Sequence, residues 1–495
     1  MKTMNKKYFV RALAMALSIL MLLSFAACAG DKNEDAGNNT PTLDISTETD
    51  ELKPVFSGNT YDGRDFIILC RRDTDEGTYK SDIIINEITQ SSSQVDKAIY
   101  DRNITIEELM DVKFTYVEVA NETKFTQSIN AATMSDADTY DLIAGHGRYV
   151  FKGVLNGFYM DWNQLEYVNL DAPWWSQSAR EEWTTTSKRL YMMNGDLSYM
   201  SVGSANVMYF NRDVFSNAKI TTPYEHVKND NWTLETFEKS VRDADAAMVG
   251  DGSGLPETDT FGYGTEAWRG PIQAVYSAGV STFAKGGDGK FSIAIDSNRV
   301  TDAFGDYQDL VNNSGAVYYA GIGIGAARDH FMNEVYAYFD DNVKSAVEFN
   351  GSGLNFGIVP WPKYDKDTED YNSLVGSGTN TFAVLKNTSE DNRIRISDVL
   401  EAMSYYGYKD VIPYYFDTVI SYQASQDEYT YEMLQLVRKT LHFDLGHYAN
   451  FGGIGDIGKD VIEGKEGYGE TISTALTAIK GNVKMELEVW YQLDD

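Results

Sequence analysis

Residues 140–147, YDLIAGHG, form a short apolar run that ends in a glycine-containing loop. Such a run is typical of a buried strand. The runs DFIILC at 65–70 and VKFTYVEVA at 112–120 also have strand character, and apolar residues near helical spacing follow each of them. Strands that alternate with helices pair in parallel and place ligands in the crevice outside their carboxyl ends. The sequence therefore predicts an α/β fold with binding residues in the loops that follow strands.

The N-terminus has the composition of a secretion signal. Four basic residues precede or border an uncharged run at 12–30, and no acidic residue occurs before position 31. The run ends in small residues, which is the pattern that a signal peptidase cleaves. We therefore interpret residues 1–27 as a signal peptide.

The end of this run resembles the lipobox of bacterial lipoproteins, in which a cysteine receives a lipid and becomes the new N-terminus. Here that cysteine is Cys28, which follows two alanines. Phe25 stands where lipoboxes usually have leucine, so ordinary cleavage after Ala29 stays open. An uncleaved membrane anchor is the third alternative, because the uncharged run is just long enough to span a bilayer.

The stretch that follows, AGDKNEDAGNNTPTLDISTETDELKP, has few large apolar residues and many acidic ones. Such a composition cannot bury enough surface to offset the entropy of ordering. We interpret residues 28–58 as a flexible tether. A lipid followed by a tether predicts a globular protein held at the outer face of the bacterial cytoplasmic membrane.

The net charge of −32 excludes nucleic acid as a partner, because such a chain repels phosphates. The other cysteine, Cys70, lies in a strand-like run and is expected to be a buried thiol, so we expect no disulfide within the chain. About 440 residues after the tether exceed what one core usually holds, and this length favours two lobes. The aromatic content of 13% is high.

The second half of the chain continues the alternation of strands and helices. A helix is predicted at 231–248, with Thr233 as its N-cap and Phe237, Val241 and Ala244 on its buried face. Predicted strands are LYMMNGDLSYM at 190–200, ANVMYFNRDVF at 205–215, EVYAYF at 334–339, SAVEFN at 345–350, FGIVPWP at 356–362 and TNTFAVL at 379–385. Two long helices are expected at 391–408 and 427–441.

Several of these segments, in this order, resemble the extracellular solute-binding proteins of bacterial ABC importers, in particular the carbohydrate-binding, family 1-like branch of lipoproteins. The similar segments are YDLIAGHG, GVLNGFYMDWNQLEYVNLDAPWW at 153–175, NGDLSYMSVGSANVMYFNRDVF at 194–215, NWTLETFEKSVRDA at 231–244 and FGIVPWPKYD at 356–365. Each fragment alone is weak, whereas their order and spacing together are specific.

The resemblance implies a two-lobed periplasmic-binding-protein-like fold with a hinge of crossing strands and a C-terminal helical region. It places 59–205 and 330–378 in lobe 1, and 206–329 and 379–495 in lobe 2. It also implies a monomer that captures a solute between the lobes and delivers it to membrane permease subunits, with no cofactor and no enzymatic activity. The chain has no Gly-x-x-x-x-Gly-Lys-Ser/Thr loop of an ATPase.

A sugar offers hydroxyl groups at its rim and C–H groups on its faces, so its receptor needs polar side chains and flat aromatic rings in loops at strand ends. For the pair Trp174 and Trp175, we expect Trp174 in the core and Trp175 exposed, since neighbouring residues of an extended chain face opposite sides. The expected ligand-binding residues are Arg71, His146, Arg148, Trp175, Asn206, Glu266, Trp268, Arg269, Tyr319 and Trp361.

Other functions remain open at this point. The solute is expected to be a sugar or oligosaccharide, and a peptide or polyol is the alternative. A secreted glycoside hydrolase needs two carboxylates about 5–10 Å apart, and no compact acidic motif identifies such a pair; a purely adhesive surface protein is a further alternative. His442 and His447 are five residues apart, which does not match the four-residue spacing of His-Glu-x-x-His, so no metal site is predicted.

Overall fold

The computed structural model describes residues 52–71, 82–135, 138–287, 290–421 and 428–494. Residues 53–495 form one unit. The predicted signal peptide, Cys28 and most of the predicted tether lie outside the described residues. Within the described ranges, no helix is both long enough and apolar enough to cross a membrane.

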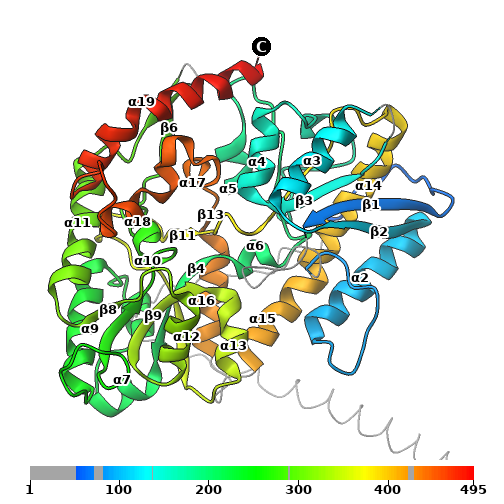
Figure 1. Cartoon of the computed structure of the whole chain (residues 1–495). Helices are drawn as coiled ribbons and strands as arrows, with labels where there is room; N and C mark the ends of the chain where they lie inside the picture. Colours follow the sequence, from blue (N-terminus) through cyan, green and yellow to red (C-terminus); the bar gives the residue numbers. More distant parts are fainter. Residues whose placement is uncertain (1–51, 72–81, 136–137, 288–289, 422–427, 495) are drawn as a thin grey trace, which may run out of the picture. The chain divides into compact units, whose positions relative to one another are not determined.

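The first sheet has the strand order β12-β3-β1-β2. Its strands are β1 (Arg64–Arg71), β2 (Val112–Val119), β3 (Leu142–His146) and β12 (Asn380–Ala383). β1 pairs in parallel with β2 and β3, whereas β12 is antiparallel to β3. The predicted strands at 65–70, 112–120 and 140–147 are confirmed, and Cys70 is buried in β1. α2 (Gln94–Met110) and α3 (Glu122–Thr133) pack against these strands (Figure 1).

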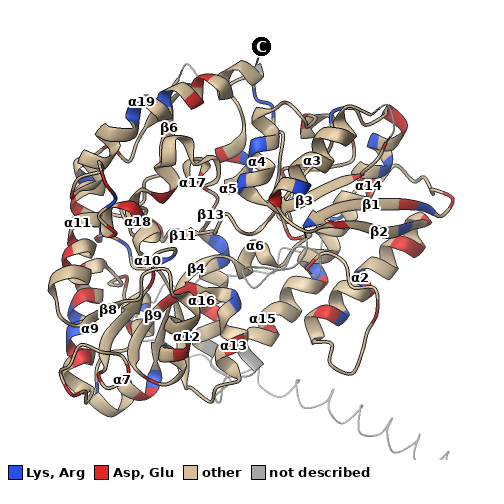
Figure 2. Cartoon of the chain, viewed as in Figure 1, with Lys and Arg blue, Asp and Glu red and all other residues tan. Residues whose placement is uncertain are grey.

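The second sheet has the order β10-β4-β9-β5-β8. Its strands are β4 (Asn206–Asn211), β5 (Phe261–Thr265), β8 (Val317–Tyr319), β9 (Tyr336–Asn342) and β10 (Phe356–Pro360). β5 is parallel to β8 and β9, and β4 is antiparallel to β9 and β10. Figure 2 shows charged residues mainly on helices and loops, and the strands of both sheets mainly uncharged. Two small sheets pair β6 (Phe283–Lys285) with β7 (Phe291–Ile293) and β11 (Ser373–Leu374) with β13 (Leu441–His442).

The chain passes between the two large sheets at residues 204–206 and 374–380, and these crossings are bonded to each other. Ala205 and Val375 form an isolated antiparallel bridge. The Gly376 amide donates to the Ser204 carbonyl at 2.9 Å, and the Val343 amide donates to the Ala205 carbonyl at 3.0 Å. The start of β4, the end of β9 and the approach to β12 are therefore held side by side.

The strand pairing differs from the predicted lobe boundaries after residue 330. Residues 330–378 were expected in the lobe of 59–205, but β9 and β10 pair within the second sheet. Residues 379–495 were expected in the other lobe, but β12 pairs with β3 of the first sheet. The apolar runs at 334–339, 356–362 and 379–385 have similar composition, and composition does not specify which distant strand each one pairs with.

Local sequence rules explain the helix α9 (Leu234–Ala247). The Thr233 side chain caps it by accepting from the Thr236 amide at 3.3 Å, and Phe237, Val241 and Ala244 are buried as predicted. By contrast, the predicted strand SAVEFN is wrong. Ala346–Asn350 form the helix α13, because Val343–Ser345 already turn as a 3-10 helix directly after β9.

Further helical elements complete the described part of the chain. They are α4 (Gly147–Leu155), η1 (Trp162–Gln164), α5 (Gln177–Trp183), α6 (Met200–Gly203), α7 (Arg212–Ala218), α8 (Pro223–Lys228), α10 (Gly270–Ala274), α11 (Asn298–Asn313), α12 (Ile324–Met332), η2 (Val343–Ser345), α14 (Glu390–Tyr406), η3 (Gly407–Val411), α15 (Ile412–Ser421), α16 (Glu428–Lys439), α17 (Leu445–Ala449), η4 (Phe451–Asp456), α18 (Ile457–Ile462), α19 (Ile472–Tyr491) and η5 (Gln492–Asp494). The two long helices expected at 391–408 and 427–441 correspond to α14 and α16.

A buried ion pair fixes α14 to the first sheet. Arg395 Nη2 donates to Asp141 Oδ1 at 2.6 Å, and Arg395 Nη1 donates to the Asp65 carbonyl at 2.6 Å. The other oxygen of Asp141 accepts from the Ile67 amide at 2.7 Å. Both side chains are almost fully buried. The pair therefore joins the loop before β3, the strand β1 and a helix from far along the chain.

Replacement of Asp141 by alanine should lower the free energy of unfolding by about 3–5 kcal/mol, because it leaves the Arg395 charge buried without its partner. Urea unfolding followed by circular dichroism would measure the loss. Lys97→Ala breaks the exposed pair with Asp101 on α2, and that control should change stability by at most about 0.5 kcal/mol. Equal losses in the two variants would contradict a special role for the buried pair.

Candidate functional site

Two of the predicted site residues end neighbouring strands of the first sheet. Arg71 is the last residue of β1 and His146 is the last residue of β3. Because β1 and β3 are parallel, both side chains lie at the same sheet edge. Arg71 is largely buried, and its Nη1 donates to Glu122 Oε1 at 2.5 Å.

His146 also caps the helix that follows it. Its Nδ1 accepts from the Arg148 amide at 3.2 Å, at the first turn of α4. Burial, together with the positive charges of Arg148 and Arg71, lowers the pKa of His146 to about 3. The imidazole is therefore neutral at any physiological pH.

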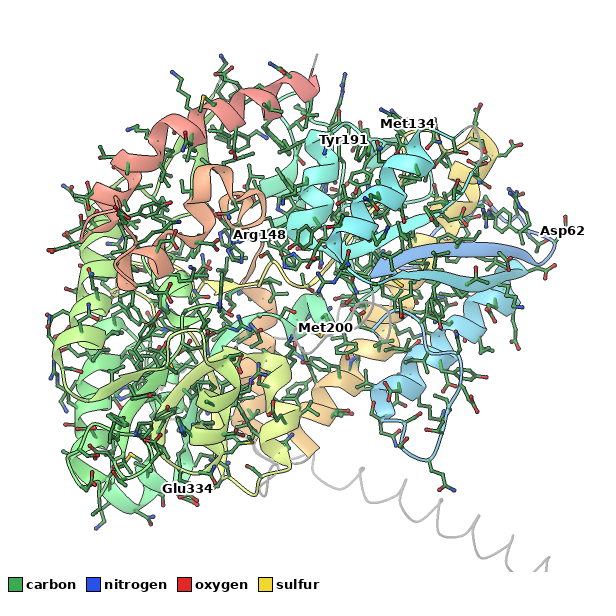
Figure 3. All side chains as sticks on the ribbon, in the orientation of Figure 1. Asp62, Met134, Arg148, Tyr191, Met200 and Glu334 are labelled. Carbon is green, nitrogen blue, oxygen red and sulfur yellow. The ribbon has the colours of Figure 1, made fainter. Side chains whose placement is uncertain are left out.

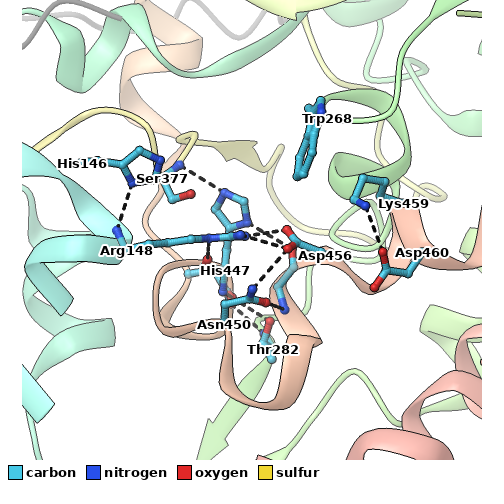
Figure 4. Close-up of polar contacts among 12 residues, drawn as sticks. His146, Arg148, Trp268, Thr282, Ser377, His447, Asn450, Asp456, Lys459 and Asp460 are labelled. Atoms are coloured by element: carbon cyan, nitrogen blue, oxygen red, sulfur yellow. Dashed lines mark hydrogen bonds and ion pairs between the residues drawn. The ribbon is translucent and has the colours of Figure 1, made fainter. Parts of the chain in front are cut away.

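Arg148 joins the first sheet to the C-terminal segment, which we define as residues 440–494. Its Nη1 and Nη2 donate to the two oxygens of Asp456 at 2.9 and 2.6 Å, and its Nε donates to the His447 carbonyl at 3.1 Å. Figure 4 shows Arg148 and Asp456 pointing toward each other, and Figure 3 places Arg148 between the C-terminal helices and the first sheet. In this arrangement the guanidinium is a bidentate link between the two parts.

His447, beside this link, is fixed by two backbone contacts. Its Nε2 accepts from the Ser377 amide at 3.2 Å, and its Nδ1 donates to the Gly455 carbonyl at 3.3 Å. Burial and the charge of Arg148 lower the pKa of His447 to about 4. The crossing at 374–380 is thereby attached to the C-terminal segment through a neutral side chain.

The second sheet brings four more predicted residues to one edge. Glu266 and Arg269 follow β5, Tyr319 ends β8, and both strands are parallel to β9. Asn206 begins β4, which is antiparallel to β9, and its partner in register is Asn342 at the end of β9. The side-chain Nδ2 of Asn342 donates to Asn206 Oδ1 at 2.7 Å. These residues therefore meet at the carboxyl ends of β5, β8 and β9.

A buried carboxylate organises this edge. Asp341 has no exposed surface and accepts from Arg269 Nε at 3.2 Å, from Arg328 Nε at 2.6 Å and from Ser345 Oγ at 2.8 Å. Burial alone would raise the pKa of Asp341, but Arg269 and Arg328 outweigh it and hold the pKa below the usual value. Burial and the repulsion of Arg269 lower the pKa of Lys344, the next cation along the chain, to about 8.

Glu266 and Trp268 form the loop between β5 and α10. Glu266 is fully buried, its Oε2 accepts from the Trp268 amide at 2.8 Å, and burial raises its pKa. Trp268 has 41% of its surface exposed, and Lys459 Nζ lies 4.6 Å from its ring centroid. An exposed indole held over a cation offers a flat apolar surface at the sheet edge.

Tyr319 reaches the same part of the C-terminal segment. Its hydroxyl donates to Glu463 Oε1 at 3.3 Å, and burial and the charge of Glu463 raise its pKa. Glu463 in turn lies 3.5 Å from Lys459 Nζ, which also contacts Asp460 at 3.0 Å. The second-sheet edge is therefore bordered by an ion-pair network on α18.

The prediction for Trp175 is wrong in one respect, since Trp174 and Trp175 are both buried, each with 2% of its surface exposed. The chain turns here, with the Trp175 amide bonded to the Ala172 carbonyl, so the two rings are not placed on opposite faces of an extended segment. Trp175 Nε1 donates to Glu401 Oε2 at 2.9 Å. A cavity of about 220 Å³ lies beside the pair and is also lined by Asp196 and Arg438.

Trp361 likewise lies in the core of the second-sheet region, with 1% of its surface exposed. Its Nε1 donates to Ser277 Oγ at 2.8 Å, and its ring packs near Tyr307. The structure thus brings together Arg71, His146 and Arg148 at one edge and Asn206, Glu266, Trp268, Arg269 and Tyr319 at the other. Trp361 follows the end of β10 at this second edge but is buried, and Trp175 is buried against Glu401.

Sequence reasoning missed Asp341, Arg328 and Lys459. Asp341 could have been found, because it follows the predicted strand at 334–339 and strand ends were the criterion. Arg328 lies on α12 and Lys459 on α18, and neither follows a strand. Their places depend on tertiary packing, for which the local pattern gives no signal.

One group in the described residues has a spacing that suits a metal ion: Glu182, His442 and Asp444. Protein donors already occupy its carboxylates. Asp444 accepts from Thr282, Tyr276 and the His447 amide, and Glu182 accepts from Ser281 Oγ at 2.8 Å. Burial opposes protonation of His442, but Asp444 and Glu182 raise its pKa. The group is held together by these hydrogen bonds, with His442 Nε2 at 3.5 Å from Asp444 Oδ2.

Comparison with known proteins gives structural neighbours only. No family model matches the chain, and no curated protein matches it. UgpB from Mycobacterium tuberculosis, solved with glycerophosphocholine, is 14% identical, with a TM-score of 0.55 over 79% of this chain and 95% of that one. A cyclo/maltodextrin-binding protein solved with maltotetraose is 13% identical, with a TM-score of 0.55 over 86% and 98%. The chain has the periplasmic-binding-protein-like fold.

A further neighbour with this fold is an ABC transporter solute-binding protein from Agrobacterium radiobacter K84, solved with ribitol. It is 12% identical, with a TM-score of 0.50 over 86% of this chain and all of that one. The predicted two-lobed α/β fold is confirmed. At this identity the likeness defines the fold, and the site has to be derived from the residues of this chain.

The free energy of unfolding should depend on pH through Glu401, the buried carboxyl group that accepts from Trp175 Nε1. Burial raises the pKa of Glu401 to about 7 in the folded protein, against about 4.5 when unfolded. The folded state therefore binds the proton more tightly, and this group's contribution to stability is full below pH 4.5 and falls as pH rises to about 7. The difference between these two pKa values corresponds to about 3 kcal/mol.

Glu401→Gln keeps an oxygen for Trp175 Nε1 and removes the titration. Relative to the parent, the variant should gain about 2 kcal/mol of stability between pH 5 and pH 8, measured by urea unfolding at each pH. Glu390→Gln, at an exposed position in the first turn of the same helix, serves as the control for removing one carboxyl group from α14 and should change stability by at most about 0.5 kcal/mol. An unchanging difference for Glu401→Gln would show that the buried carboxyl is not protonated in the folded protein.

Proposed function

We propose that this chain is the solute-binding protein of an ABC importer and that its solute is a sugar or an oligosaccharide. The observation that carries the proposal is the placement of polar side chains from both sheets at the carboxyl ends of parallel strands, in a periplasmic-binding-protein-like fold. That edge is where open α/β sheets bind ligands.

The chemistry of the two edges suits a polyhydroxylated solute. The exposed ring of Trp268 offers an apolar face for the C–H side of a sugar ring. His146 and Arg269, which are partly exposed, offer a neutral and a charged polar group for hydroxyls. Two neighbours were solved with the polyhydroxylated ligands maltotetraose and ribitol, and a third with glycerophosphocholine, which has two hydroxyl groups beside its phosphate diester and quaternary ammonium group. The ribitol complex keeps a polyol as the second candidate solute.

The buried state of the acidic residues favours binding over hydrolysis. A retaining or inverting glycosidase needs two carboxyl groups that reach the scissile bond. Glu266 and Asp341 have no exposed surface, and Asp341 is committed to two guanidinium groups. The neighbours named above are binding proteins. We therefore propose that the chain binds its solute and releases it chemically unchanged. We also propose that it acts as a monomer and without a cofactor.

We also propose that the chain is anchored to a membrane. The lipobox-like segment at Cys28 and the acidic tether after it support a lipid anchor at the outer face of the cytoplasmic membrane. Solute bound between the lobes would shift them toward a closed form by its greater affinity for that form. Permease subunits in the same membrane would then recognise the closed form.

A thermal-shift screen of the purified chain against saccharides, polyols and peptides tests the solute class. A ligand that binds only the folded state raises the melting temperature by mass action. We expect a saccharide or, as the second candidate, a polyol to give the largest rise, with 1:1 stoichiometry in calorimetry. A rise with peptides alone would refute the sugar assignment, and turnover of a glycan without stoichiometric binding would refute the transport proposal.

Trp268→Ala locates the site within the same screen. The saccharide that gives the largest shift should bind about tenfold more weakly, about 1.4 kcal/mol, because the apolar stacking surface is lost. The melting temperature of the unliganded variant should change by about 2 °C or less, since the ring is largely exposed. Tyr414→Ala, on α15 with 48% of its surface exposed, is the matched control and should bind normally.

Cys28→Ala tests the anchor in a bacterial host that lipidates its exported proteins. The parent chain should sediment with membranes and label with a fatty acid, whereas the variant should appear in the soluble extracytoplasmic fraction. Cys70→Ala removes the other cysteine and should leave membrane association intact. A soluble parent whose mature chain begins after Ala29 would establish ordinary cleavage, and a membrane-bound variant would establish an uncleaved anchor.

A further inference from the structure

His146 has a fixed assignment of proton donor and acceptor. Its Nδ1 accepts from the Arg148 amide at 3.2 Å, so this nitrogen carries no proton. A neutral imidazole has one donor and one acceptor nitrogen. The proton of His146 must therefore lie on Nε2, which makes that atom a hydrogen-bond donor.

The surroundings keep the ring neutral. Arg148 and Lys152 lie on α4, Arg71 ends β1, and His447 belongs to the C-terminal segment; all four disfavour a positive charge on His146. The Tyr149 ring lies 4.9 Å from the imidazole, centroid to centroid. Two acids pair with these cations: Asp456 binds both Nη atoms of Arg148, and Glu122 binds Arg71 Nη1. Burial and these charges hold the pKa of His146 at about 3.

The donor atom has no hydrogen-bond partner among the residues that the structure describes. His146 is partly exposed at the carboxyl end of β3. The residue facing Nε2 is Gly378, where an added Cβ would lie 4.0 Å from that atom. A partly exposed donor at the carboxyl end of a parallel strand is positioned to reach an incoming oxygen.

We propose that His146 determines solute specificity as an obligate hydrogen-bond donor through Nε2–H, so that the solute must present a lone-pair oxygen at this point. A hydroxyl, ether or carboxylate oxygen satisfies it. The ammonium group of an amino sugar does not, because it has no lone pair to accept from Nε2–H. This inference rests on the proposed function, in that it assumes a solute at the first-sheet edge.

The protonation state can be tested without any solute. The chain has five histidines, so the imidazole ¹⁵N signals of the intact protein are few, and those of His146 are assigned by their absence in His146→Asn. We expect a protonated Nε2, an unprotonated Nδ1 and no titration between pH 5 and pH 8. Protonation of Nδ1, or titration within that range, would overturn the proposal while leaving the proposed function intact.

Binding to the best saccharide of the thermal-shift screen tests the contact. His146→Asn keeps a side-chain oxygen able to cap α4, since Asn is a favourable N-cap residue, and removes the Nε2–H donor. We expect the unliganded melting temperature to change by about 2 °C or less and the dissociation constant to rise about tenfold. The ratio of the dissociation constants of His146→Asn and the parent should vary less than about twofold between pH 5 and pH 8.

His226→Asn, the same change on α8, is the matched control and should leave affinity unchanged. Unaltered affinity in His146→Asn would overturn the inference, as would tighter binding of the matching amino sugar than of the parent sugar. If the parent chain binds neither saccharides nor polyols, the proposed function itself is refuted. The ¹⁵N experiment distinguishes that outcome from a wrong assignment of the proton on His146.

Discussion

The hydrogen bonds between the two chain crossings are the constraint on which the candidate site depends. Gly376 is bonded to Ser204, and Val343 to Ala205, so the crossings are held in one register. The second-sheet edge begins directly beside them at Asn206 and Asn342, and His447 attaches the crossing at Ser377 to the C-terminal segment. The two edges are also joined by the C-terminal segment, where α17 packs against α4 and α18 packs against α10. The relative position of the two halves of the candidate site is therefore set by these crossings together with that segment.

Charge is distributed differently at the two edges. At the second sheet, Asp341 holds Arg269 and Arg328 in place, which orients the guanidinium of Arg269 beside the exposed Trp268. At the first sheet, Arg148 is committed to Asp456 of the C-terminal segment. Both Arg148 and Asp456 are mostly buried, and separating a buried, bidentate pair is costly. The Arg148–Asp456 link therefore holds α4 close to the C-terminal segment and opposes any motion that would separate them.

Local pattern predicted the elements, whereas long-range pairing decided their arrangement. The three strands of 65–147, the capped helix at Thr233 and the long helices α14 and α16 follow from short-range periodicity and capping. The assignment of β9, β10 and β12 to sheets does not, because pairings such as Phe382 with Ala144 join residues far apart in sequence. The same limit explains the site. Residues at strand ends, such as His146 and Glu266, were predicted, but Arg328 and Lys459 reach the edge from helices.

The two tryptophans show why an aromatic pair in sequence is a poor guide to a binding surface. An extended segment would have exposed one ring, but the turn at Ala172 directs both inward, and Glu401 then holds Trp175 from α14. Trp268 is exposed for the opposite reason. Its amide is bonded to the buried Glu266, so the backbone is fixed while the ring extends over Lys459. An exposed ring on a rigid loop loses little side-chain entropy on binding, and this favours Trp268 over either residue of the pair as the platform for a solute.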